Sequence, residues 1–138
     1  MHTTISSPPV APQLNLRWLR AALLTDAVVT GANGLAYVLG ATLLTDLLGP
    51  PKAFLHGIGV FLTCFAMVIC VVGRRPSIPT AGVWFAIVMN TAWVVASVMY
   101  VIAADWLTTA GIVWTALQAL VVLGFGLAQL VGLRRASS

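Results

Sequence analysis

Four long apolar stretches, separated by short segments rich in proline or charge, make up most of this chain. They predict helices at about residues 16–44, 53–72, 80–103 and 108–133. A helix needs about 20 apolar residues to cross a bilayer, and each stretch is long enough. The apolar runs are continuous, whereas membrane β-strands alternate every second residue. The pattern therefore predicts an all-α polytopic membrane protein, a four-transmembrane-helix antiparallel up-down bundle.

The segments between these stretches set the expected domain organisation. Residues 1–14 contain three prolines and several hydroxyl side chains, a composition typical of a disordered N-terminal tail. Residues 49–51 read Gly-Pro-Pro, which cannot continue a helix. The link at residues 104–107 is so short that its flanking helices must pair antiparallel. We expect a single transmembrane domain over residues 15–135.

Composition points to the same environment. The chain has 138 residues, of which 60% are hydrophobic and only 7% are charged, and its mean hydropathy is +1.02. Soluble domains carry about 25% charged residues, so this chain has too few polar side chains to cover a water-exposed globule. The expected partner is the lipid bilayer, and the length leaves no room for a separate soluble domain.

The positive charge is distributed unevenly along the sequence. The net charge is +4, and all six arginines flank the ends of apolar stretches: Arg17, Arg20, Arg74, Arg75, Arg134 and Arg135. An even number of helices places all six on one side, opposite Lys52, Asp46 and Asp105. The positive-inside rule then predicts that both termini are cytoplasmic. The arginines thus set the orientation of the helices in the membrane and do not form a phosphate-binding surface, so we expect no nucleic acid partner.

The first apolar stretch contains the only acid expected inside the membrane, Asp26. Its spacing with Thr30, Asn33 and Tyr37 places all four side chains on one helix face. Asp26 is expected roughly 9 Å from the midplane, on the cytoplasmic side. The candidate partners of its carboxylate are Arg20, Arg74, Arg75, Asn90 and Gln129. Asp26 is either a member of a structural ion pair or a proton or cation site, and intramembrane acids serve in both ways.

One polar residue of each predicted helix falls near the membrane midplane. With the apolar parts of the helices centred near residues 32, 62, 92 and 120, all four lie within about 3 Å of the midplane at 1.5 Å per residue: Asn33, Thr63, Asn90 and Gln118. The favoured interpretation is an interhelical hydrogen-bond layer that fixes the register of the helices. The alternative is a polar binding site, because transporters place theirs at this depth.

The remaining chemistry is sparse. His56 lies near the outer end of the second stretch, at the depth of Tyr37, Ser97 and Tyr100, and we expect it to be structural and hydrogen-bonded. Cys64 and Cys70, six residues apart on one helix, point in different directions and cannot form a disulfide with each other. The sequence has three acids and no catalytic or metal-binding motif. We expect no enzyme activity, cofactor or metal.

Several segments resemble one family of short bacterial, mainly actinobacterial, integral membrane proteins. They are LLTDAVVTGANGLAY at residues 23–37, LLGPP at 47–51, VMNTAWVVAS at 88–97 and LAQLVGLRR at 127–135. The resemblance covers about residues 17–135 and implies no known activity. It implies that Asp26, Asn33, Asn90 and Gln129 are the positions that matter. Small multidrug transporters have a similar length, but they use a glutamate and often have a weak charge bias.

Two functions therefore stay open. The first is a non-enzymatic structural or accessory bundle that binds itself or another membrane protein. The second is a small oligomeric transporter that uses Asp26 as a proton or cation site. The candidate functional or network residues are Asp26, Thr30, Asn33, Tyr37, His56, Asn90, Gln118 and Gln129.

Overall fold

A computed structural model describes residues 10–137, with side chains placed for residues 16–136. This part of the chain is entirely helical apart from its connections. The five helices are α1 (Val10–Leu39), α2 (Ala41–Leu48), α3 (Lys52–Arg74), α4 (Thr80–Ala103) and α5 (Thr109–Ser137). Four of them contain a segment long and apolar enough to cross a membrane: Leu16–Leu39, Lys52–Arg74, Thr80–Ala103 and Thr109–Ala136. The predicted all-α class and the four apolar spans are confirmed.

The first helix differs from its predicted bounds. An uninterrupted helix to residue 44 is wrong, because the chain breaks at Gly40 and continues as the separate helix α2. Glycine is a poor helix former, and here it provides the turn between α1 and α2. Residues 1–9 of the predicted tail lie outside the described residues, and α1 already includes residues 10–14.

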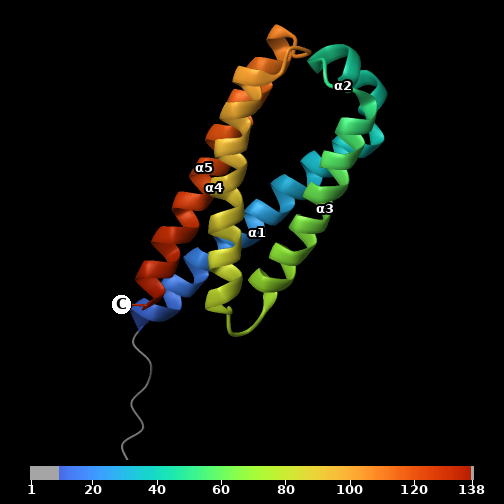
Figure 1. Cartoon of the computed structure of the whole chain (residues 1–138). Helices are drawn as coiled ribbons and strands as arrows, with labels where there is room; N and C mark the ends of the chain where they lie inside the picture. The colour runs from blue at the N-terminus through green and yellow to red at the C-terminus, as the bar shows by residue number, and fades with distance from the viewer. Residues whose placement is uncertain (1–9, 138) are drawn as a thin grey trace, which may run out of the picture.

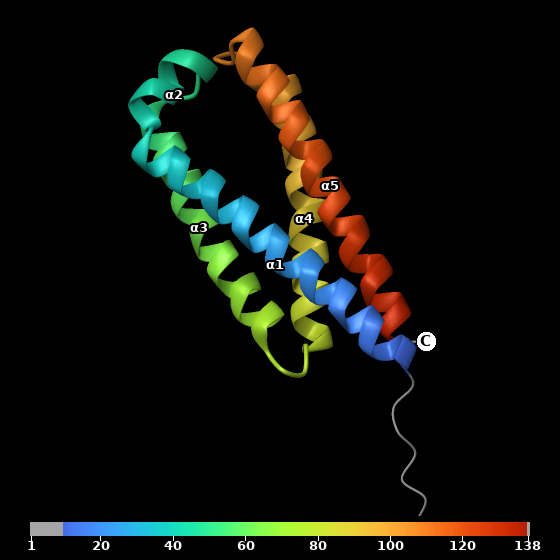
Figure 2. The same cartoon turned by 180° about the vertical axis from the view of Figure 1, so that it is seen from behind.

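The long helices form two pairs, α1 with α3 and α4 with α5, and α1 also packs against α5. As Figures 1 and 2 show, α1 runs obliquely across the molecule beside α3, and it passes behind α4 in Figure 1 and in front of it in Figure 2. The packing of α1 is mainly against α3 and α5, and that of α4 is mainly against α5. Although α3 and α4 follow each other in sequence, their backbones approach closely at few places. Aromatic side chains span the space between them, with Phe61 stacked on Trp93 and Phe65 against Phe85.

The outer surface of the helices is apolar. Leu39 and Ile102 are 83% and 80% exposed, and many other large hydrophobic side chains are exposed along all four spans. The largest buried cluster lies between α1, α3 and α4 and includes Leu23, Ile69 and Val83. A surface of this kind is stable in hydrocarbon. In water, its exposure is unfavourable by about 25 cal/mol per Å² of apolar area. The helices are those of a multi-pass membrane protein.

Two glycines let α1 and α3 approach closely. A Cβ added to Gly34 would lie 2.9 Å from the carbonyl oxygen of Gly59, and one added to Gly59 would lie 2.7 Å from that of Gly34. Small residues allow such contacts between membrane helices, where dispersion forces replace the hydrophobic effect. The pair sets the closest point of the α1–α3 contact.

The connections are held at both ends of the molecule. At one end, Thr108 donates from its backbone N to Leu48 O at 3.0 Å and from Oγ1 to Leu47 O at 2.8 Å. Gly49 has φ of +106°, and a side chain there would collide with the carbonyl oxygen of Trp106. These contacts fix α2 against the turn before α5.

At the other end, Arg20 closes the end of α3. Its Nη1 donates to the carbonyl oxygens of Gly73 at 2.7 Å and Arg75 at 2.8 Å. The last carbonyls of a helix have no partner within it, so a cation from a neighbouring helix satisfies them well.

Candidate functional site

The Asp26 side chain lies at the centre of a buried polar cluster. It is 0% exposed, and its carboxylate accepts three hydrogen bonds. Thr30 Oγ1 donates to Oδ1 at 2.8 Å, while Asn90 Nδ2 and Gln129 Nε2 donate to Oδ2 at 2.9 and 2.7 Å. Asn90 Nδ2 also lies 3.1 Å from Gln129 Oε1. We call these four residues the Asp26 cluster; it joins α1, α4 and α5.

The break at Gly40 explains why Asp26 meets Asn90. Because the apolar part of α1 ends at Leu39, its middle falls next to Ala27, and not near residue 32 as the longer predicted helix implies. The middle of α4 falls beside Thr91. At 1.5 Å per residue, Asp26 and Asn90 each lie within about 3 Å of the middle of their helix. Asp26 also accepts from Gln129, which lies several residues beyond the middle of α5 toward the arginine-bearing end, so its depth on the cytoplasmic side stays a prediction.

The donors to Asp26 are uncharged. Of the arginines that were candidates to neutralise it, Arg20 instead donates to the end of α3, and Arg74 and Arg75 are exposed at that end. Asn90 and Gln129, the two amides among the candidates, do bind it. All three partners donate to the two carboxyl oxygens of Asp26. The cluster is a closed hydrogen-bonded unit.

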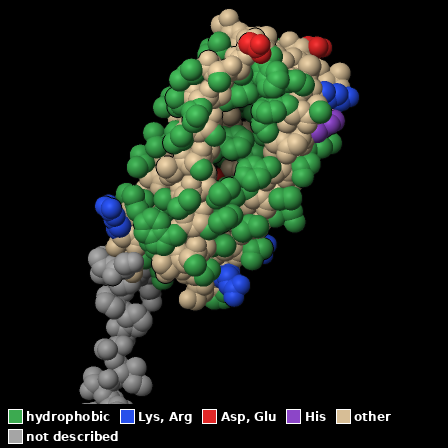
Figure 3. All heavy atoms as spheres, viewed as in Figure 1, with side chains coloured by type: hydrophobic (Ala, Val, Ile, Leu, Met, Phe, Trp, Pro, Cys, Tyr) green, Lys and Arg blue, Asp and Glu red, His purple; other side chains and the backbone are tan. Residues whose placement is uncertain are grey.

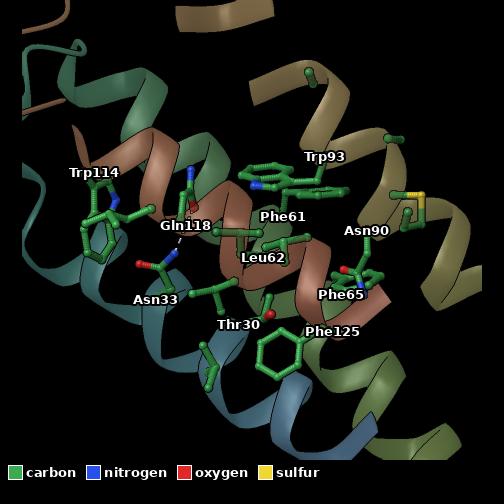
Figure 4. Close-up of a pocket in the computed structure, with 17 residues that line it drawn as sticks. Thr30, Asn33, Phe61, Leu62, Phe65, Asn90, Trp93, Trp114, Gln118 and Phe125 are labelled. Carbon is green, nitrogen blue, oxygen red and sulfur yellow. Dashed lines mark hydrogen bonds between the residues drawn. The ribbon is translucent and has the colours of Figure 1, made fainter. Parts of the chain in front are cut away.

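A cavity of about 400 Å³ lies beside this cluster, between all four long helices. Figure 3 shows the open side of the molecule with a hollow between the rows of apolar side chains. Figure 4 shows the lining residues, among them Phe61, Phe65 and Trp93, which project into the space from α3 and α4. Thr30 and Asn90 belong both to the lining and to the Asp26 cluster. The cavity thus reaches the partners of Asp26, although the carboxylate itself is covered.

A second cavity of about 210 Å³ continues from the first toward α2. The two cavities share four lining residues: Trp93, Ala96, Trp114 and Gln118. In the second, Trp114 Nε1 donates to the Tyr37 hydroxyl at 2.6 Å, which connects α5 to α1. Its far end is formed by Leu48, Pro50 and Leu107, next to the connections. Together the cavities extend from the middle of the bundle to the end that carries α2.

The predicted midplane layer is divided. Asn33 Nδ2 donates to Gln118 Oε1, but at a long 3.5 Å (Figure 4). Thr63 Oγ1 donates within its own helix, to Gly59 O at 2.8 Å, and Asn90 joins the Asp26 cluster. A single layer of these four residues is therefore wrong. Asn33 instead pairs with Gln118 of α5, and Asn90 pairs with Asp26, seven residues before Asn33 on α1.

His56 and the cysteines lie apart from these features. His56 is half-buried, and the hydroxyls considered for it have other partners: Tyr37 accepts from Trp114, Tyr100 from Trp106, and Ser97 donates to Trp93 O. Both cysteines are free. Within the described residues, no group of three or more His, Cys, Asp or Glu side chains could hold a metal ion.

Sequence reasoning did not identify the aromatic residues of the larger cavity. Phe61, Phe65 and Phe125 stand among apolar neighbours in the sequence, where nothing distinguishes a cavity wall from a lipid-facing position. Trp93 and Trp114 also line both cavities. The polar lining residues Thr30, Asn33, Asn90 and Gln118 are all among the predicted candidates.

The fold and this interior define a multi-pass helical membrane protein with a buried acid and an apolar-walled cavity. No family model, curated protein or solved structure matches the chain.

Proposed function

We propose that this chain is a non-enzymatic accessory bundle of the bacterial inner membrane, with both termini in the cytoplasm, that acts by binding itself or another membrane component. The proposal rests on the state of Asp26, whose carboxylate is fully buried and bonded to three uncharged donors from its own helix, α4 and α5. A group held in this way fixes helix register. It is not presented to a substrate.

The distribution of charge supports the orientation. The end of the molecule formed by the start of α1, the α3–α4 turn and the end of α5 carries all six arginines (Figures 1 and 3). The other end carries Asp46, Lys52 and Asp105. Cytoplasmic loops of bacterial membrane proteins are enriched in arginine and lysine, so the arginine end is assigned to the cytoplasm.

The test is the stability of the purified protein in detergent with Asp26 replaced. Asp26→Leu removes the acceptor of three hydrogen bonds, each worth about 0.6–1.7 kcal/mol in a membrane protein, so we expect a loss of about 2–5 kcal/mol. Asp26→Asn keeps one carbonyl oxygen as acceptor and should lose less. Asp46→Asn, at an exposed position of α2, is the matched control and should change stability by less than about 0.5 kcal/mol. Equal or greater stability of Asp26→Leu would contradict the proposal.

One observation favours a second candidate, a transporter with Asp26 as its proton or cation site. Thr30 and Asn90 bind Asp26 and also line the larger cavity, so a path toward the acid exists from the α2 end. Liposomes containing the protein and a trapped pH-sensitive dye distinguish the two functions. An accessory bundle should equilibrate a proton gradient no faster than empty liposomes. A transporter should be faster, and Asp26→Asn should abolish the difference.

A further inference from the structure

We propose that the larger cavity binds an uncharged, lipid-soluble molecule whose planar ring carries carbonyl oxygens. The inference rests on the membrane placement of the four spans proposed above. It assigns the cavity a ligand that enters sideways from the bilayer, between α3 and α4.

The position of the cavity determines how a ligand reaches it. Its lining comes from the central part of every span, including Thr30 of α1, Leu62 of α3, Ala92 of α4 and Val121 of α5. At this depth the surroundings are hydrocarbon, because the apolar core of a bilayer is about 30 Å thick. The backbones of α3 and α4 are separated, with Phe61 and Trp93 stacked between them, and Figure 3 shows a hollow on this face, where the cavity opens toward the lipid. The ligand must therefore be soluble in the membrane.

The walls select an uncharged molecule with a flat body. The lining contains no Asp, Glu, Lys, Arg or His. Phe61 and Trp93 stand with their rings nearly parallel, 6.0 Å between centroids and 10° between planes. Phe65 continues this row, 6.4 Å from Phe61. Aromatic side chains favour offset stacking and edge contacts with other rings at centroid distances of about 4.5–7 Å.

The polar part of the lining requires an acceptor. The Gln118 carboxamide borders both cavities, and its one hydrogen bond among the described side chains is the 3.5 Å contact that its oxygen accepts from Asn33. Its Nε2 has no acceptor among the described side chains and borders the cavities, and an unpaired donor is costly in an apolar environment. An acyl chain offers no acceptor, whereas a ring carbonyl does. The amide therefore favours a carbonyl-bearing ligand over a lipid tail.

The volumes are consistent with such a molecule. Small-molecule sites measure about 300–1,000 Å³, and the larger cavity, at about 400 Å³, falls within this range. The adjoining cavity of about 210 Å³ can receive a substituent of the ring. Trp114 and Ala96 line both, so one ligand can occupy the two spaces together.

The experiment uses decylubiquinone as the probe and decylbenzene, which has the same tail but no carbonyl, as its control. The melting temperature of the full-length protein in detergent is measured against the concentration of each. A ligand that binds only the folded state raises this temperature, and we expect a saturable rise of roughly 3 °C or more with the quinone alone. Gln118→Leu should raise the half-saturating concentration of the quinone at least about tenfold, the effect of losing one good hydrogen bond.

A pair of variants on α4 tests the location. Ala96→Phe fills the space between the two cavities and should abolish the rise. Val95→Phe, at the neighbouring position, which is 54% exposed and outside both linings, should keep it. Ala92→Phe replaces Ala96→Phe if the latter does not fold, because Ala92 also lines the larger cavity.

Three outcomes would overturn the proposal. Equal stabilisation by decylbenzene, or no effect of Gln118→Leu, would make the cavity a site for lipid tails. An unchanged response of the filled variants, or no saturable response of the wild type, would show that no such ligand binds there. If the wild type were a dimer and Ala96→Phe made it monomeric, the opening of the cavity would be occupied by a second copy of the chain. None of these results depends on the Asp26 variants. The ligand proposal can therefore fail while the accessory function, which the Asp26 variants test, still holds.

Discussion

The Asp26 side chain shows how an acidic group can be held inside an apolar bundle by uncharged hydrogen-bond donors. Burial of an isolated carboxylate is very unfavourable, and the cost falls only when its oxygens are fully hydrogen-bonded. Thr30 supplies one bond from the next turn of the same helix, while Asn90 and Gln129 supply the others from α4 and α5. All three donors thus bind the same carboxylate, and removal of any one leaves Asp26 with one hydrogen bond fewer.

This dependence predicts that Asn90 and Gln129 act as a unit. Asn90→Leu and Gln129→Leu each remove a bond to Asp26 and their mutual bond, so each should cost about 1–3 kcal/mol. In a double-mutant cycle measured by unfolding in detergent, the double variant should deviate from additivity by at least about 0.5 kcal/mol.

Thr91→Val is the control for this cycle. Thr91 is exposed beside Asn90, and its hydroxyl donates to Ile87 O within α4, so it should couple to neither residue. Strict additivity of Asn90→Leu and Gln129→Leu would mean that they stabilise the fold independently, against the geometry of the cluster.

At this scale the sequence identified the right residue types more readily than their partners. Asp26, Asn90 and Gln129 stand out because polar groups are rare and costly in an apolar stretch. Arg20 was an equally reasonable partner for Asp26, since a long side chain can reach inward from a helix end. The choice between them depends on the end of α3, whose free carbonyls attract Arg20, and this is a property of the packed helices.

Among the elements, the division of the first apolar stretch has the largest effect. The stretch contains several glycines, and nothing in its local pattern distinguishes Gly40, where the helix breaks, from Gly31 or Gly34, where it continues. The break follows from the packing of α2 beneath the α4–α5 turn, through Leu48 and Thr108. Because α1 ends at Leu39, its middle lies several residues nearer to Asp26 than the middle of the predicted helix. The polar residues of α1 therefore face different partners from those that the predicted midplane layer implies.

The contact between α1 and α3 gives a prediction with an internal control. Gly59→Ala places a Cβ 2.7 Å from Gly34 O and also 2.7 Å from a methyl group of Val38, so the two helices must separate. We expect a loss of about 1–3 kcal/mol in unfolding measurements, the usual cost of overpacking.

Gly57→Ala, two residues away on the same helix, introduces a Cβ with no atom within 4 Å. It should be neutral or stabilising by up to about 1 kcal/mol, because alanine favours the helix more than glycine does. If both variants lost stability equally, the close approach of Gly34 and Gly59 would not explain the effect of Gly59.

For the whole molecule, the number of spans was predictable and the open side was not. Length and hydropathy determine that four helices can cross the membrane, because hydrocarbon requires continuous apolar segments of a minimum length. The separation of α3 from α4 depends on the oblique path of α1, which is set by Gly34 and Gly59 and by contacts along α5. Crossing geometry of this kind has no signature in a single apolar sequence, so the aromatic walls of the cavity could not be inferred.

The last prediction concerns the orientation of the molecule, which follows from where the chain turns. The α3–α4 turn carries Arg74 and Arg75, and Ser77 is exposed within it. At the opposite end, Asp105 is exposed in the α4–α5 turn. With the native cysteines replaced by alanine, Asp105→Cys should react with a membrane-impermeant maleimide in intact bacterial cells expressing the protein. Ser77→Cys should react only after the membrane is permeabilised, because the arginine-rich turns are retained in the cytoplasm. Labelling of both positions in intact cells would indicate two opposite orientations, and would contradict an orientation set by six arginines against one lysine.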